Sequence, residues 1–184
     1  MPIKLMPPRT IRQNWDQSAS VAWMLVTASG PTRSDLPHGL RPTPQDYQEH
    51  AEWRVAFRVH SALTKVWYSP REVFKGSPPL DEWWPGGRLP DRPGGFLSSV
   101  EKHWVPSVDD QLILFFRGDS NDSGKGFGEP LIWYPKLAEV QLLGEKAVQI
   151  DPIRGAFDGP WYDRDALLAE LRELAAGVDT SAQQ

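Results

Sequence analysis

The chain of 184 residues has no cysteine. This absence excludes disulfides, thiol catalysis, iron–sulfur clusters and cysteine-based zinc sites. Any reactive or binding site must therefore be built from other side chains. No motif in the sequence indicates a cofactor.

Long apolar runs are also lacking. The longest spans residues 21–26, whereas a membrane-spanning helix needs about 20 apolar residues. Prolines at positions 2, 7 and 8 interrupt the N-terminal stretch before it could form the apolar part of a signal peptide. We expect a cytoplasmic protein without a membrane partner, although an export signal removed before Met1 would leave the same sequence.

Clusters of basic residues are missing as well. The 20 Lys and Arg residues are outnumbered by 24 Asp and Glu residues, which gives a formal charge of -4 and a pI of about 5.6. Nucleic-acid-binding domains usually carry a clustered basic footprint and a high pI. Nucleic acid is therefore not an expected partner.

Proline, by contrast, is abundant, with 18 residues, roughly twice its usual share. Each interior proline removes a helix hydrogen bond and clashes with the preceding turn, which argues against an all-helical fold. The apolar patterns instead predict strands over residues 21–28, 71–75, 112–116 and 131–134, and a hairpin of residues 137–143 and 146–150. Residues 29–44 and 78–106 are expected to be loops because they are rich in proline and glycine.

Residues 45–68 have two interpretations. Apolar and polar side chains alternate between Trp53 and Leu63, as in a half-buried strand. A continuous helix beginning at Pro44 would instead align Tyr47 and Val55 on one stripe. We favour a short helix near residues 44–51 followed by a strand from about residue 53 to 63.

Helices are predicted near both ends of the chain. Thr10 can cap a short helix over residues 10–19. Asp163 can cap a C-terminal helix whose apolar face holds Leu167, Leu168, Leu171 and Leu174, with Gly177 at its end. We expect one globular domain over residues 1–177 and a flexible tail over residues 178–184.

These elements predict an α+β, mainly β fold: a bent antiparallel sheet or OB-like barrel with long loops and a C-terminal amphipathic helix. The segments 18–21, 53–59, 73–76, 112–116 and 165–176, in that order, resemble uncharacterised bacterial proteins with OB-like β-barrels. The resemblance implies a barrel and no particular activity. The long loops at residues 29–52 and 77–110 and the lack of an export signal depart from that group.

The Trp-rich loop is the strongest candidate for binding. Adjacent side chains of an extended chain point in opposite directions, so at most one of Trp83 and Trp84 is expected to be fully buried. An exposed indole there, or Trp104, could anchor a partner or stack on a sugar. Filling of the core is the alternative role for these rings.

Two weaker candidates lie elsewhere. Arg54, Arg58 and His60 would line one strand face and could hold an anion, although a solvated face explains them as well. Residues 118–129 fail the spacing of a phosphate-binding loop. Asp119, Asn121 and Ser123 match the first half of a calcium loop, but position 12 is Pro130, and a solvated turn is the alternative.

No motif assigns a catalytic residue, because the four histidines lack any metal-binding or triad spacing. The predicted function is therefore a non-enzymatic binding module that contacts another protein through its Trp-rich loop. Two alternatives stay open. One is a hydrolase using carboxylates such as Asp109, Asp110, Asp119 and Asp122, and the other is a carbohydrate- or small-ligand-binding protein on the same aromatic loop.

Overall fold

The structure is a computed structural model that describes residues 7–34, 40, 43–49, 62–89, 104–118, 121–122, 132–151 and 155–177. The helices are α1 (Ile11–Gln17), α2 (Pro44–Glu49) and α4 (Arg164–Ala175). The strands are β1 (Ser20–Arg33), β2 (Leu63–Lys75), β3 (Asp81–Pro85), β4 (Gln111–Phe116), β5 (Asn121–Asp122), β6 (Ile132–Trp133), β7 (Lys136–Leu143), β8 (Lys146–Gln149) and β9 (Trp161–Asp163).

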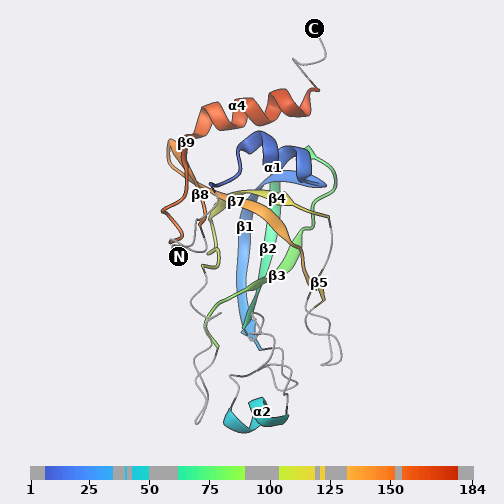
Figure 1. Ribbon diagram of the computed structural model, residues 1–184, viewed down its shortest axis with the longest axis vertical. Coiled ribbons are helices and arrows are strands. Elements are labelled where there is room, and N and C mark those ends of the chain that lie inside the picture. Colours follow the sequence, from blue (N-terminus) through green and yellow to red (C-terminus); the bar gives the residue numbers. More distant parts are fainter. Residues whose placement is uncertain are drawn as a thin grey trace, which may run out of the picture.

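Seven of these strands form one antiparallel sheet in the order β3-β2-β1-β4-β7-β8-β9, and β5 and β6 form a separate two-stranded ribbon. Helices α1 and α4 lie together at one end of the molecule, and α2 lies at the other (Figure 1). The predicted mainly β fold, with a bent antiparallel sheet and a C-terminal helix, is confirmed. Within the described strands the sheet does not close, so it is barrel-like only in a loose sense.

Successive side chains of a strand point to opposite faces of the sheet. Because the central strands are buried on both sides, both faces of the sheet are apolar. On β4, Ile113 and Phe115 point to one face, and Leu112, Leu114 and Phe116 point to the other. We call the first the helix face, because Ile11 of α1 and Leu167, Leu168 and Leu171 of α4 pack there. We call the second the inner face. It also contains Met24, Val66, Tyr68 and Trp84.

The C-terminal helix forms as the sequence predicts. The Asp163 carboxylate accepts a hydrogen bond from the Ala166 backbone N–H at 3.0 Å, which satisfies a donor left free at the helix start. Gly177 has a φ of +67°, the left-handed conformation that commonly ends a helix. Leu174 is only half-buried, so the apolar contact with the sheet ends before the last turn.

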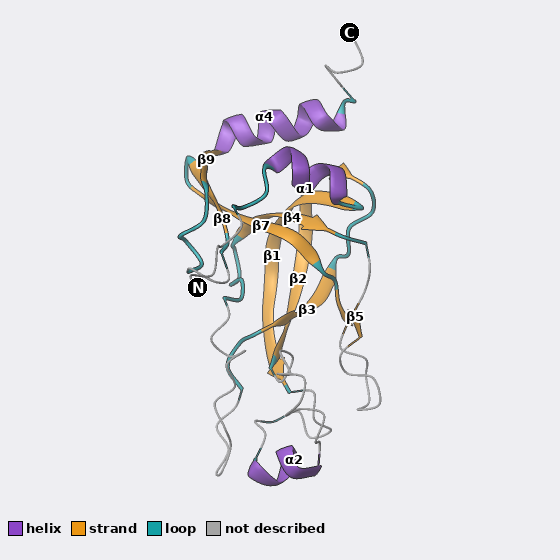
Figure 2. Cartoon of the chain, in the orientation of Figure 1, coloured by secondary structure: helices purple, strands orange, loops and turns teal. Residues whose placement is uncertain are grey.

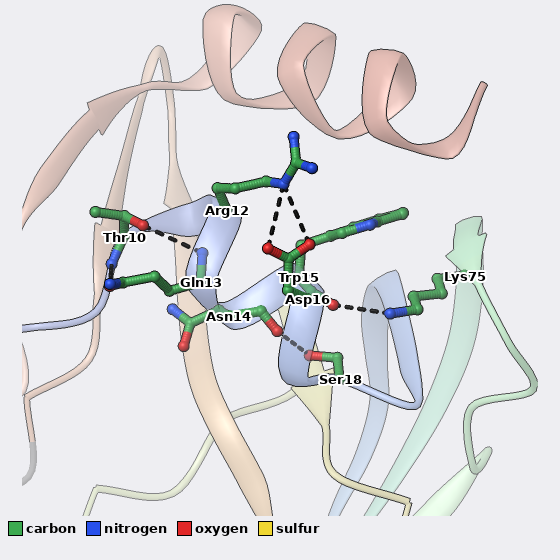
Figure 3. A network of polar contacts seen from close by, with 8 residues as sticks. All are labelled: Thr10, Arg12, Gln13, Asn14, Trp15, Asp16, Ser18 and Lys75. Carbon is green, nitrogen blue, oxygen red and sulfur yellow. Dashed lines mark hydrogen bonds and ion pairs between the residues drawn. The ribbon is translucent and has the colours of Figure 1, made fainter. Parts of the chain in front are cut away.

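Helix α1 begins with a capping box, in which the side chains of Thr10 and Gln13 each accept a hydrogen bond from the other residue's backbone N–H. Its last turn is joined to the end of β2 because the Lys75 ammonium donates to the Trp15 carbonyl at 2.8 Å. Figure 3 shows this contact beside the Ser18 hydroxyl, which donates to the Asn14 carbonyl. Helix α1 is thereby fixed over the helix face.

Strands replace parts of both predicted loops. Strand β1 continues through residues 29–33 because Ser29 and Thr32 pair with β2, and the register shift between them leaves Gly30 and Pro31 at an irregularity. Strand β3 lies inside the predicted 78–106 loop. Pro79 precedes the strand, and Pro85 is its last residue, opposite Leu63, so no proline lies in the strand's interior. Composition alone could not reveal these pairings.

The ambiguous segment is described only in part. Helix α2 agrees with the short helix predicted near residues 44–51, and β2 begins at Leu63. Figure 2 shows α2 far from the other two helices. Residues 50–61 lie outside the described residues, as do the terminal tail and Arg54, Arg58 and His60, so those interpretations stay predictions. No helix in the part of the chain that the structure describes is long and apolar enough to cross a membrane.

Candidate functional site

Both tryptophans of β3 are buried, each with 4% of its surface exposed. Trp84 packs on the inner face, where its ring meets Trp104 edge-on at 5.7 Å. Trp83 points to the opposite face and packs beside Leu63 and below the Lys65 ammonium. The prediction that at most one of the two would be buried is wrong, because both sides of β3 are covered. Neither indole offers an exposed ring, and Trp104 is half-buried.

Trp84 belongs to a buried polar group that the sequence did not predict. Glu82 of β3 and Lys136 of β7 form an ion pair at 2.8 Å, and their side chains are 0% and 2% exposed. The Tyr68 hydroxyl donates to Glu82 Oε1 at 2.6 Å and accepts a hydrogen bond from the Trp84 indole N–H. We call Tyr68, Glu82, Trp84 and Lys136 the inner cluster.

Strand register explains how the cluster forms. Val66 lies opposite Glu82 in the ladder between β2 and β3, which places the carboxylate on the inner face. Strands β3 and β7 are separated by three intervening strands in the sheet order. Their side chains meet only because the sheet curls, so the ion pair bridges two strands that share no ladder.

The Lys136 ammonium is well compensated for its burial. It donates to Glu82 Oε1 at 2.8 Å and to the Tyr134 carbonyl at 3.2 Å. It also lies 4.2 Å from the ring centre of Trp84 and 5.7 Å from that of Phe116. Ring faces attract cations, and the attraction grows when water is excluded. The buried ammonium therefore has a carboxylate, a carbonyl oxygen and two aromatic rings around it.

Burial shifts two proton equilibria around the cluster. It raises the pKa of Tyr68 well above its ordinary value of 10.0, and the charge of Glu82 adds to the effect. The pKa of Glu139, on the inner side of β7, is raised above its ordinary 4.5 by burial, partly offset by Lys136 and reinforced by Glu82. The folded protein therefore favours the neutral form of both groups.

Replacing Glu139 with glutamine should stabilise the fold at neutral and alkaline pH but not in acid. Below pH 4.5 the carboxyl is protonated in both states. As the pH rises, the unfolded chain releases this proton first, so the wild type loses stability until the raised pKa is passed. Above the raised pKa, the free energy of unfolding of E139Q should exceed that of the wild type by about 1.4 kcal/mol for each unit by which folding raises the pKa of Glu139.

Urea unfolding of E139Q and wild type at several pH values measures this difference. Glu145→Gln, on the exposed turn between β7 and β8, is the control for removing a negative charge. A stability difference for E139Q that stays constant between pH 4 and 9 would contradict the expected result.

A hollow of about 290 Å³ lies where β1 begins and β4 ends. Its wall consists of Ala19, Ser20, Ser77, Pro79, Phe116, Gly118 and Tyr134. We call it the end hollow. The rings of Phe116 and Tyr134 meet edge-on, with centres 6.5 Å apart. The Tyr134 backbone N–H donates to Glu82 Oε2 at 3.1 Å, so the hollow's aromatic wall is joined directly to the inner cluster.

Asp109 and Asp110 are not among the described residues that line the end hollow. Asp109 and Asp110 lie in the turn before β4, where Asp109 has a φ of 72° and Asp110 accepts a hydrogen bond from the Ser107 N–H at 2.8 Å. These contacts shape a turn. For Asn121 and Asp122 only the place in β5 is described.

The remaining predicted site residues lie outside the described residues: Asp119, Ser123, Arg54, Arg58 and His60. Within the described ranges no group of three or more His, Cys, Asp or Glu side chains could hold a metal ion. The proposed calcium loop and anion stripe therefore stay predictions.

Sequence reasoning missed Glu82, Lys136 and Tyr68. One signal was present: Glu82 is a charged residue directly before two tryptophans. Nothing local connects it to Lys136, 54 positions away. Comparisons of the chain with protein-family models, curated proteins and solved structures found no match.

Proposed function

We propose that the chain is a non-enzymatic binding module and that its binding surface includes the end hollow. The observation that supports this most is the half-buried Tyr134, which lines this open space, packs edge-on against Phe116 and is backed by a buried ion pair. A wall fixed before the ligand arrives reduces the entropy lost on binding.

The lining indicates the ligand's chemistry. Two aromatic residues, a proline and two serines, Phe116, Tyr134, Pro79, Ser20 and Ser77, are among the residues that surround the hollow. These groups suit an uncharged, partly apolar ligand that can also form a hydrogen bond. The volume of about 290 Å³ lies at the lower end of the usual range for small-molecule pockets. It suits a single aromatic or proline side chain presented by a partner protein.

This proposal changes the location of the binding surface. The sequence pointed to Trp83, Trp84 and Trp104, whose described rings are buried or half-buried. In the proposed arrangement Trp84 supports the site from within, through its hydrogen bond to Tyr68. The proposed partner is still another protein.

Filling the hollow should abolish binding without unfolding the protein. Ser77 is exposed and lies outside the strands, so Ser77→Trp should change the free energy of unfolding by no more than about 0.5 kcal/mol. A phage-displayed random peptide library is panned on the wild type. Enriched peptides should bind S77W about tenfold more weakly or worse, because the new indole occupies their space.

Ser69→Trp is the matched control, because Ser69 is an exposed serine of β2 that does not line the hollow. Peptides should bind it as they bind the wild type. On titration, the amide signals of Ser20, Ser77 and Gly118 should shift. Peptides that bind S77W normally, or that shift signals elsewhere, would contradict the proposal. A parallel glycan array tests the carbohydrate alternative.

A further inference from the structure

The Tyr134 backbone is held at both of its polar groups by one ion pair. Its N–H donates to Glu82 Oε2 at 3.1 Å, and its carbonyl accepts from Lys136 Nζ at 3.2 Å. The two charged groups are themselves joined at 2.8 Å. Tyr134 and Pro135 connect β6, which ends at Trp133, to β7, which begins at Lys136. The Pro135 carbonyl accepts a hydrogen bond from the Arg117 backbone N–H at 2.9 Å, whereas the two polar backbone groups of Tyr134 are bound by side chains.

The same contacts determine where the Tyr134 ring stands. The ring meets Phe116 edge-on, with an interplanar angle of 88°, and both rings line the end hollow. Phe116 is only 1% exposed and is fixed in β4. Tyr134 is half-buried, so it is the wall residue whose position depends on how its backbone is held.

Stability alone does not explain a buried ion pair at this position. Taking two charges out of water is costly, and replacing a buried pair with apolar side chains is often neutral or stabilising. Such pairs can instead select one arrangement among several of similar energy. Glu82 reaches Tyr134 and Lys136 from β3, which shares no ladder with β7, whereas Lys136 itself pairs with Phe116 of β4.

We infer that Glu82 and Lys136 are positioning residues for the end hollow: by holding the Tyr134 backbone, the buried pair sets the shape of the hollow and hence which ligands it accepts. The part of this inference that concerns ligand choice rests on the proposed function. The position of Tyr134 itself can be measured without any ligand.

The test replaces both charges together, with Glu82→Met/Lys136→Met, so that no lone charge is buried. The double variant should fold, with a cooperative unfolding transition and the wild-type strand signals. It should lose the nuclear Overhauser contacts between the Phe116 and Tyr134 rings and shift the Tyr134 amide signal. Peptides selected on the wild type should bind it about tenfold more weakly, and panning on it should yield a different consensus.

Glu139→Gln is the matched control. It removes a carboxylate beside the same cluster but leaves the groups that contact Tyr134, so ring contacts and peptide affinity should be unchanged. Intact ring contacts in the folded double variant would overturn the inference, as would lost contacts with unchanged affinity and consensus. If the double variant does not fold, Glu82→Gln, which keeps the side-chain length, is measured by the same criteria.

The proposed function fails by a different measurement. If no enriched peptide shifts the signals of the end hollow in the wild type, the hollow is not the binding surface, and the claim about ligand choice falls with it. The ring contacts would still show whether the pair holds Tyr134.

Discussion

Lys136→Met should lower the free energy of unfolding by about 3–5 kcal/mol. The substitution keeps most of the side-chain volume but leaves the Glu82 carboxylate, which is fully buried, without its cation. It also removes the donor to the Tyr134 carbonyl and the cation between the rings of Trp84 and Phe116. An uncompensated buried charge is among the most destabilising changes that one substitution can make.

Urea denaturation of the wild type, Lys136→Met, Glu82→Met/Lys136→Met and Asp16→Asn tests whether the lone buried charge causes this loss of stability. Glu82→Met/Lys136→Met should be more stable than Lys136→Met alone, because the second substitution removes the lone charge. Asp16→Asn breaks the exposed pair with Arg12, in which the two side chains are 50% and 56% exposed, and should cost about 0.5 kcal/mol or less. If Lys136→Met costs no more than Asp16→Asn, the inner cluster does not hold a desolvated charge pair.

Gly76→Ala should destabilise the fold by about 2–5 kcal/mol, from two separate causes. Gly76 directly follows β2 and has a φ of +66°, a backbone conformation that residues with a Cβ rarely adopt. A Cβ at this position would lie 2.2 Å from the Ala19 carbonyl oxygen. That oxygen belongs to the backbone leading into β1, so it cannot rotate away as a side chain could.

Gly144→Ala separates the two causes. Gly144 has a φ of +61°, almost the same, but nothing lies within 4 Å of its Cβ position. Gly144→Ala should lower the free energy of unfolding only by the cost of placing alanine in a left-handed conformation, about 1–2 kcal/mol. The additional loss for Gly76→Ala measures the steric cost of the close approach of β2 to β1. Equal losses of stability, measured by thermal or urea unfolding, would show that the two strand ends can separate freely.

Local patterns in the sequence predicted the elements that local interactions specify. Helix α4 has its cap at Asp163, its apolar stripe and its terminal Gly177 within one short segment, and each was found in its predicted role. Strand β4 was recognisable because five apolar residues are bounded by charged residues and glycine. The hairpin of β7 and β8 turns at Gly144, whose positive φ is what primed hairpin turns require.

The elements that the sequence did not reveal depend on distant partners. Strand β3 is flanked by prolines, and only its ladder with Thr64 and Lys65 shows that Trp83 and Trp84 are extended and covered on both sides. The pairing of Glu82 with Lys136 results from the curvature of the sheet. The alternation of apolar and polar residues along a strand predicts which face of the sheet a side chain occupies. It does not predict how strongly the sheet curves.

The contact between α4 and the sheet has a consequence for how the chain is made. The Arg172 guanidinium binds the Glu72 carboxylate through three hydrogen bonds across 100 positions of sequence. The ribosome releases every strand of the helix face, including those that contribute Val21, Ile113 and Val140, before it releases α4. Until then the nascent chain exposes an apolar surface that a chaperone can bind.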